Sequence, residues 1–321
     1  MISHVTKFIN LNDKEFIIHP QPQQNELLSS WLVRVARANN VATTSFTNMH
    51  FKEYQKNILW QRDLDIWCPE SLLEKLSHKS HLSKHQIFDM TLKSYEGKLR
   101  HKIHGKNRTH FIQSLGNYAH IKRNGGLRFC PLCLANDSIP YFRKEWRLSF
   151  YTACLEHKCF LLNRCPNCNS PLTLSKSYQE KDFTFCYKCG IDLKKINIIQ
   201  EDCELEAIIA LMNVLNNGYG NKLGQAVPSI EYFDFLKQIN KMIYLWENTR
   251  EISEQILFSK PRVKNGGYED YMSIKEQHIL YLASNHLVLS HYAFFQFIEA
   301  NHILNCYIYK DIFGKKKLEK Y

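Results

Sequence analysis

Four short motifs in the middle of this 321-residue chain place pairs of metal-binding side chains three residues apart. They are CPLC at 130–133, CLEH at 154–157, CPNC at 165–168 and CYKC at 186–189. A turn of this kind brings two ligands close enough to share one ion, and a second pair completes a tetrahedron around zinc. Because cytoplasmic thiols stay reduced, we interpret the pairs as metal sites rather than as disulfides or a redox dithiol.

The spacing leaves the pairing of the motifs open. An interleaved arrangement is one possibility, and Cys159 is a spare thiol that could replace the histidine. Sequential filling, which we favour, gives a site of three cysteines and a histidine and a site of four cysteines, with the predicted ligands Cys130, Cys133, Cys154, His157, Cys165, Cys168, Cys186 and Cys189. Since four protein ligands leave no open position on either ion, we predict two structural Zn²⁺ ions and no catalytic residues.

The segment before the second motif predicts a strand. Trp146, Leu148 and Phe150 alternate with polar or amphipathic residues, which is typical of a strand with one buried face. Arg147, on the opposite face, would either contact phosphate or lie in solvent. Gly190, directly after the last motif, suits a left-handed turn.

Helical patterns precede the cysteine-rich segment. Apolar residues from Leu27 to Val35 repeat at helical spacing, and a second helix follows Pro69. A third begins at a capping box of Ser83 and Gln86 and continues towards Gly97. Two short helices with a tight break are the pattern of a helix-turn-helix, although many such pairs are simple helical hairpins.

Helical patterns also follow the cysteine-rich segment. An apolar stripe runs from Leu205 to Leu215, residues 218–228 are interpreted as a loop, and a long helix follows at 230–246. Ser273 caps a further helix, and the last spans about 291–307. The predicted fold is therefore mainly α with a small zinc-bound β-containing module, in which helix-turn-helix-like regions flank tandem zinc ribbons or fingers.

Three regions are expected from these patterns. They are an N-terminal helical region with a basic stretch at 1–128, a tandem zinc-finger module at 129–195 and a C-terminal helical domain at 196–321. The chain is long enough for each region to have a core of its own.

Positive charge predicts a polyanionic partner. Lysine and arginine number 42 against 31 acidic residues, which gives a net charge of +11. Residues 98–128 contain no acid at all, and a solvated face usually mixes both signs. We therefore predict a surface that contacts DNA phosphates, with the candidates Lys98, Arg100, Lys102, Lys106, Arg108, Lys122, Arg123 and Arg128.

No membrane partner is expected. The longest apolar runs are only a few residues, and the first residues are too polar for a signal peptide. We expect a cytoplasmic protein that associates with the nucleoid when it binds DNA.

Two stretches of the sequence are similar to one known family. They are ELLSSWLVRVARANN at 26–40 and the cysteine-rich segment, where Trp-Arg precedes Cys154 and CLEH is followed by Leu161 and Leu162. Over about residues 20–195 the chain resembles the TniQ/TnsD family of transposon target-selection proteins. The resemblance implies a bacterial, non-enzymatic factor that engages double-stranded target DNA, or an RNA-guided complex bound to it. Such factors recruit a AAA+ ATPase regulator and, through it, the transposase. The same eight zinc ligands carry over.

The resemblance leaves two modes of targeting open. Longer family members recognise one attachment sequence directly, whereas some short members act as homodimeric adaptors on RNA-guided CRISPR effector complexes. A zinc-ribbon RNA-binding protein is a competing function. A zinc hydrolase or nuclease is a weaker one, because the sequence has no HExxH motif and no phosphate-cradling glycine loop.

Overall fold

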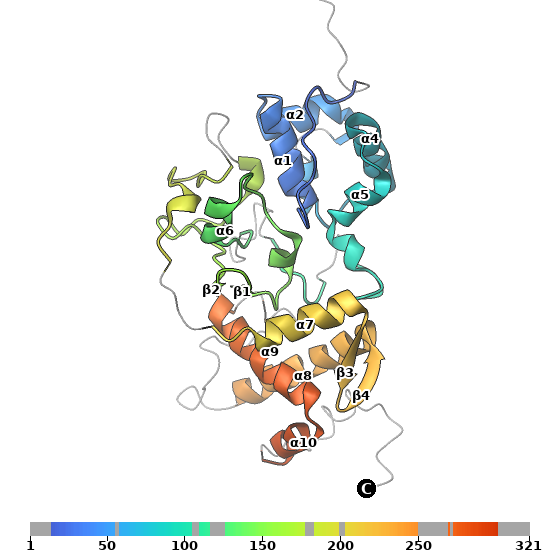
Figure 1. The fold of residues 1–321 in the computed structure, drawn as a ribbon, viewed down its shortest axis with the longest axis vertical. Coiled ribbons are helices and arrows are strands. Elements are labelled where there is room, and N and C mark those ends of the chain that lie inside the picture. The colour runs from blue at the N-terminus through green and yellow to red at the C-terminus, as the bar shows by residue number, and fades with distance from the viewer. Residues whose placement is uncertain are drawn as a thin grey trace, which may run out of the picture.

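The computed structural model describes residues 14–54, 58–104, 109–115, 126–176, 183–198, 203–249, 269 and 272–300. Helices dominate these residues and the strands are short, so the predicted fold class is confirmed. Figure 1 shows helices α1 to α5 at the top, the segment with α6 at the side and helices α7 to α10 below. Within the described part, no helix is long and apolar enough to cross a bilayer.

The N-terminal helices enclose a hydrophobic core of their own. The predicted stripe of the first helix is buried from Leu27 to Val35. The predicted capping box of Ser83 and Gln86 opens α5, but the helix ends early and passes into a 3-10 turn that ends at Tyr95. The elements are α1 Leu28–Ala38, α2 Thr43–His50, α3 Ile58–Gln61, α4 Glu70–Ser80 and α5 Lys84–Asp89, with 3-10 turns at Lys52–Tyr54 and Leu92–Tyr95.

The C-terminal part contains a hairpin that the sequence analysis missed. Residues 218–228 are not a loop, because β3 Tyr219–Lys222 and β4 Gln225–Pro228 pair as antiparallel strands. Leu223 and Gly224, with φ of 49° and 85°, form a two-residue turn whose backbone suits the twist of a hairpin. The helices are α7 Glu206–Asn217, α8 Ser229–Thr249, α9 Ile274–Leu289 and α10 His291–Ala300, and the predicted end of the last one near 307 lies outside the described residues.

The predicted strand around Trp146 is wrong. Residues Lys144–Arg147 form a 3-10 turn, called η4 here, and the strands in the described part of this segment are β1 Ala153–Cys154 and β2 Cys159–Phe160. Helix α6 Pro131–Asn136 precedes them, and further 3-10 turns lie at Leu174–Lys176 and Leu193–Lys195. Alternation failed as a signal because Arg147 is fully buried, like the apolar residues on either side of it.

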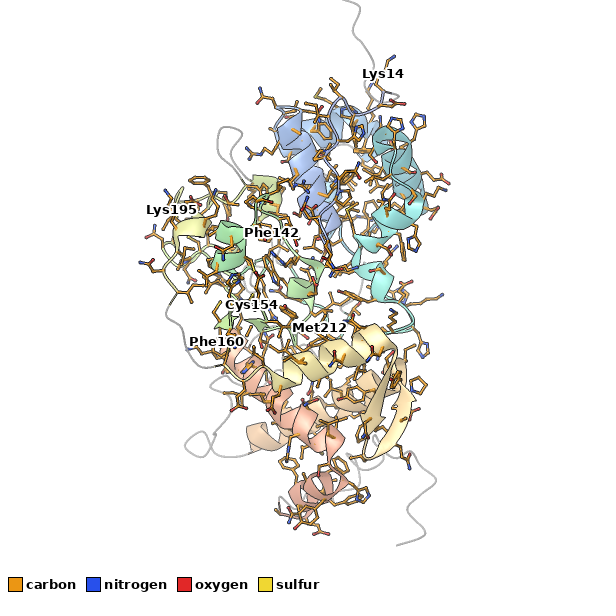
Figure 2. All side chains as sticks on the ribbon, viewed as in Figure 1. Lys14, Phe142, Cys154, Phe160, Lys195 and Met212 are labelled. Atoms are coloured by element: carbon orange, nitrogen blue, oxygen red, sulfur yellow. The ribbon has the colours of Figure 1, made fainter. Side chains whose placement is uncertain are left out.

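One hydrophobic core joins the cysteine-rich segment to the C-terminal helices. The ring of Phe150 stacks on Phe233 of α8, with 5.9 Å between the centroids and 19° between the planes. The hydroxyl of Ser149 lies 2.6 Å from that of Tyr281 on α9. The side chains of these segments, which lie far apart in the sequence, therefore pack into one interior from which water is excluded. Figure 2 shows the side chains on the ribbon.

Arg147 joins the same segment to the N-terminal helices. Its guanidinium is fully buried and donates to both carboxylate oxygens of Asp63, at 3.2 and 2.5 Å, and to Asp65 at 3.1 Å. Asp65 in turn accepts from the backbone N–H and the hydroxyl of Ser29, each at 2.8 Å, in the first turn of α1. Burial raises the pKa of Asp65 to about 6, against the lowering effect of Arg147. The expectation that Arg147 contacts phosphate or solvent is thus wrong.

Two more buried cations serve the same purpose. The ammonium of Lys144 donates to the Asp89 carbonyl at 2.5 Å and to the Ser94 hydroxyl at 2.9 Å, beyond the end of α5. Arg128 is 1% exposed, and its guanidinium donates to the carbonyls of residues 148, 149 and 151 and to Gln277 of α9. Hydrogen bonds from charged side chains therefore link all three parts of the chain.

We expect Arg147→Ala to lower the free energy of unfolding by about 3–5 kcal/mol, because it leaves Asp63 and Asp65 without their cation in a buried site. Arg62→Ala is the matched control, since Arg62 is exposed in the same segment and lies over the Trp67 ring. We expect the control to cost less than about 1 kcal/mol. Urea denaturation followed by circular dichroism measures both, and equal losses would contradict the role given to Arg147.

Candidate metal centres

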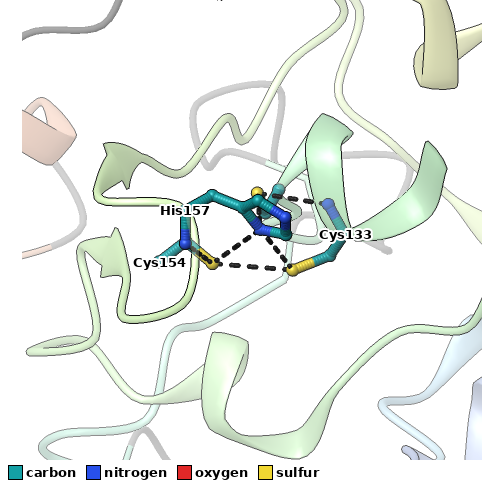
Figure 3. Close-up of side chains that lie close together, drawn as sticks. Cys133, Cys154 and His157 are labelled. Carbon is teal, nitrogen blue, oxygen red and sulfur yellow. Dashed lines mark hydrogen bonds between the residues drawn. The ribbon is translucent and has the colours of Figure 1, made fainter. Parts of the chain in front are cut away.

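The first centre is assembled by α6 and the β1–β2 turn. Cys130 is the N-cap of α6, and its sulfur accepts from the backbone N–H of Cys133 at 3.5 Å. Proline at the first helical position fixes φ there without the loss of a useful donor. Cys154 closes β1, and its sulfur accepts in the same way from the N–H of His157 at 3.5 Å. In both motifs, therefore, the first cysteine sulfur accepts a hydrogen bond from the backbone N–H three residues later. Figure 3 shows the side chains of this centre with these hydrogen bonds as dashed lines.

The four donor atoms of this centre converge on one point. The Nδ1 atom of His157 lies 3.6, 3.3 and 3.5 Å from the sulfurs of Cys130, Cys133 and Cys154, and the last two sulfurs are 3.5 Å apart. All four atoms lie within 4.8 Å of one another. Bonds of about 2.3 Å to sulfur and 2.0–2.1 Å to nitrogen give a tetrahedron with edges of about 3.6–3.8 Å, so the donor set fits a zinc ion.

Asn136 orients the histidine from outside. Its side-chain amide lies 2.9 Å from Nε2 of His157, on the opposite side of the ring from the sulfurs. The amide atom that faces Nε2 is the nitrogen Nδ2. Because an imidazole that uses Nδ1 as a ligand carries its proton on Nε2, the amide must turn its oxygen to this side to accept that proton and hold the ring. Asn136 closes α6 and was missed by sequence reasoning, because nothing in its local pattern marks it as a neighbour of His157.

The second centre consists of two similar turns. The sulfurs of Cys165 and Cys189 are 3.6 Å apart, as are those of Cys168 and Cys186, and the four lie within 4.8 Å of one another. Each turn ends in a left-handed residue, Asn169 with φ 55° and Gly190 with φ 74°, so the turn predicted at Gly190 is confirmed. The N–H of each of these residues donates 2.8 Å to the carbonyl at the start of its turn. The two halves of the centre thus repeat one geometry.

Hydrogen bonds favour thiolate at this second centre. Burial raises the pKa of Cys186, but the Ser170 hydroxyl and the backbone N–H groups of Cys189 and Lys188 lower it to about 6. The Ser170 hydroxyl also lies 3.0 Å from the sulfur of Cys168. Because metals bind the thiolate, these contacts favour the ligand form of Cys186, whereas burial raises the pKa of Cys165 to about 12. Ser170 was also missed by sequence reasoning, although it follows the CPNC motif closely.

The structure groups the eight predicted ligands in the sequential arrangement, not the interleaved one. Cys159 lies outside both groups, with its sulfur 3.7 Å from that of Cys130. His157, not Cys159, places its donor atom among the three sulfurs of the first centre. The identity of the bound ion and the assignment of these residues as its ligands stay predictions.

The candidate DNA-binding residues have mixed surroundings. Lys98 and Lys102 are exposed, and Arg100 is a quarter exposed in an ion pair with Asp234 of α8. Arg128 is wrong as a phosphate contact, since its guanidinium is buried among backbone carbonyls. The neighbouring Leu127 and Phe129 could have signalled this burial. The remaining candidates lie outside the described residues: Lys106, Arg108, Lys122 and Arg123.

We expect Cys186→Ser to reduce the metal content of the purified protein from two equivalents to one, because hydroxyl is a poor ligand for zinc. Cys159→Ser is the matched control, since Cys159 is a buried thiol beside the first centre that lies outside both groups. It should keep two equivalents. Elemental analysis after gel filtration measures both, and loss of metal from the Cys159 variant would make that thiol a ligand.

Comparison with known proteins gives one family. The family model named TniQ matches residues 17–161, which run from the segment before α1 to the end of β2. The match includes the first metal centre and leaves the second one beyond its end. No curated protein matches the chain significantly. The chain therefore carries a TniQ domain at residues 17–161, in agreement with the resemblance seen in its sequence.

Proposed function

We propose that this protein selects target sites for transposition. In this proposal it binds target DNA, or a DNA-bound RNA-guided complex, and recruits a AAA+ ATPase regulator and the transposase. The observation that carries the proposal is the TniQ match, which covers the N-terminal helices and the first metal centre. The protein would act without catalysis, in the cytoplasm and on nucleoid DNA.

Two zinc ions would stabilise the scaffold. We infer that Cys130, Cys133, Cys154 and His157 hold one Zn²⁺ and that the four cysteines of the second centre hold another. With four protein ligands each, the ions supply folding energy and have no position open for a substrate. Metal at the first centre would fix α6 against the β1–β2 turn, where the shared hydrophobic core begins.

DNA would contact the exposed part of the basic stretch. Lys98 and Lys102 are both exposed and follow the α4–α5 pair directly in the chain. In α4–α5, the left-handed residue His81 with φ 58° makes the tight break of a helix-turn-helix-like unit. We propose that 1–128 and 129–195 form the DNA-facing and metal-binding regions and that 196–321 forms a C-terminal helical domain. The same proposal includes a surface that binds the ATPase and a contact between two copies of the chain.

Selection of bound fragments from sheared genomic DNA tests how the target is found. At about 150 mM salt, binding through phosphates alone is largely suppressed. Enrichment of one sequence would mean direct recognition of an attachment site. Salt-sensitive binding without enrichment would mean an adaptor, and capture of the ATPase and a guide complex by the tagged protein would then be expected. Failure of both experiments would contradict the proposed function.

We expect the double change Lys98→Gln with Lys102→Gln to weaken binding to a random DNA duplex and to reduce the slope of log K against log salt by roughly 2, since each phosphate contact contributes about 0.9. The control is Lys75→Gln with Lys222→Gln, which removes the same charge from lysines that already pair with glutamates. Fluorescence anisotropy at several salt concentrations measures both. An equal change of slope in the two variants would make the effect one of net charge.

A further inference from the structure

An ion pair fastens the exposed end of the basic stretch to helix α8 of the C-terminal part. Arg100 lies in the loop that follows α5, and its guanidinium donates to the Asp234 carboxylate on α8. The loop is itself closed by the N–H of Gly97, which donates 2.8 Å to the Arg100 carbonyl. Lys98 and Lys102 therefore stand on either side of a residue anchored to α8. The positive charges of this loop and the charged side chains of α8 near Asp234 are therefore parts of one surface.

Helix α8 adds lysines to this surface. Lys237 and Lys241 follow Asp234 by three and seven residues, so all three lie on one face of the helix. Lys241 is exposed, and Lys237 is partly exposed without an ion pair among the described residues. Burial lowers the pKa of Lys237, and the positive charges of Arg100 and Lys241 lower it further. Asp234 and Glu269 oppose this effect without cancelling it.

Other lysines of the chain show that this arrangement is not a general surface property. Lys222 pairs with Glu231 at 2.5 Å, near the start of the same helix. Lys84 contacts two glutamates, Glu70 and Glu74, at 3.2 and 2.7 Å. Around Asp234, by contrast, the carboxylate pairs with Arg100, and Lys237 lies among the positive charges of Arg100 and Lys241 and the negative charges of Asp234 and Glu269. Like charges held together in this way cost stability in the free protein, and a row of phosphates would relieve that cost.

We propose that Lys98, Arg100, Lys102, Lys237 and Lys241 form one binding surface for the DNA backbone, in which Asp234 holds Arg100 until a phosphate replaces it. The inference rests on the proposed function, because it assumes that the protein binds DNA. It extends the DNA-binding surface from the N-terminal region to α8. It also makes Asp234 a built-in competitor of the phosphate, which sets the affinity below its attainable value.

Asp234→Asn is the sharpest test, since it removes the competitor and keeps the shape of the side chain. We expect roughly fivefold tighter binding to a random duplex and a salt slope steeper by about 1, because Arg100 becomes free to contact a phosphate. A purely structural Asp234 would instead lower the melting temperature and leave the affinity unchanged or weaker, and either result for the affinity would overturn the inference.

A second variant keeps the test independent of the folding of the first. Lys237→Gln with Lys241→Gln should weaken duplex binding and reduce the slope by roughly 2, while the melting temperature holds or rises as repulsion is relieved. Lys222→Gln, at the end of β3 where the lysine pairs with Glu231 of the same helix, should change neither. The inference would be overturned if the double variant bound the duplex as tightly as the wild type does. It would also be overturned if the wild type bound polyglutamate as tightly as it binds the duplex, because that would indicate an acidic protein partner.

The wild-type protein separates this inference from the proposed function. If it fails to bind any duplex at about 50 mM salt, direct DNA binding fails and the inference fails with it. If it binds and only the α8 variants are without effect, the inference alone is overturned. Elemental analysis of each variant confirms that the metal centres are intact before affinities are compared.

Discussion

A single buried guanidinium connects the TniQ domain to its own first helix. Arg147 has no access to solvent and relies on the carboxylates of Asp63 and Asp65 for compensation. Asp65 also accepts the N–H of Ser29 in the first turn of α1, where Leu27 provides no side-chain cap. The start of α1 therefore depends on a cation that lies more than a hundred residues later in the chain. Such a pair is costly to desolvate, and losing either partner is costlier still.

The metal centre and this ion pair are structurally continuous. Helix α6 carries Cys133, and its C-cap Asp137 has a carboxylate that accepts two parallel hydrogen bonds of 2.9 and 2.8 Å from Arg143. Arg143 is the N-cap of η4, and η4 contains Arg147. A change in the position of α6 is thereby transmitted over a few residues to α1. Salt bridges, together with any ion held by the four donor atoms, stabilise a segment whose strands are only two residues long and bury little area of their own.

Local patterns allowed the sequence to predict local structure. The capping boxes at Ser83 and Ser273 and the four metal-binding motifs depend on residues three apart, and the structure contains each of them. Prediction failed where the decisive partner was distant. From the sequence alone, Arg147 and Arg128 are both expected to be surface cations. In the structure Asp63 lies beside Arg147, and carbonyls of residues 148–151 surround Arg128. The hairpin before α8 was missed because its strands, YGNK and QAVP, carry a single β-branched residue, Val227, whereas such residues mark most strands.

The shared core also bears on how the chain is made. During synthesis the cysteine motifs emerge before helices α7 to α10. The ligands of both candidate metal centres have all been synthesised once Cys189 has been added. The contact of Phe150 with Phe233 and that of Ser149 with Tyr281, however, form only after these partners have been synthesised. Tyr281 lies near the end of the described chain. Until then the nascent protein carries both complete Cys/His clusters beside an uncovered aromatic face. Such an intermediate is prone to aggregate, so rapid completion or a chaperone would protect it.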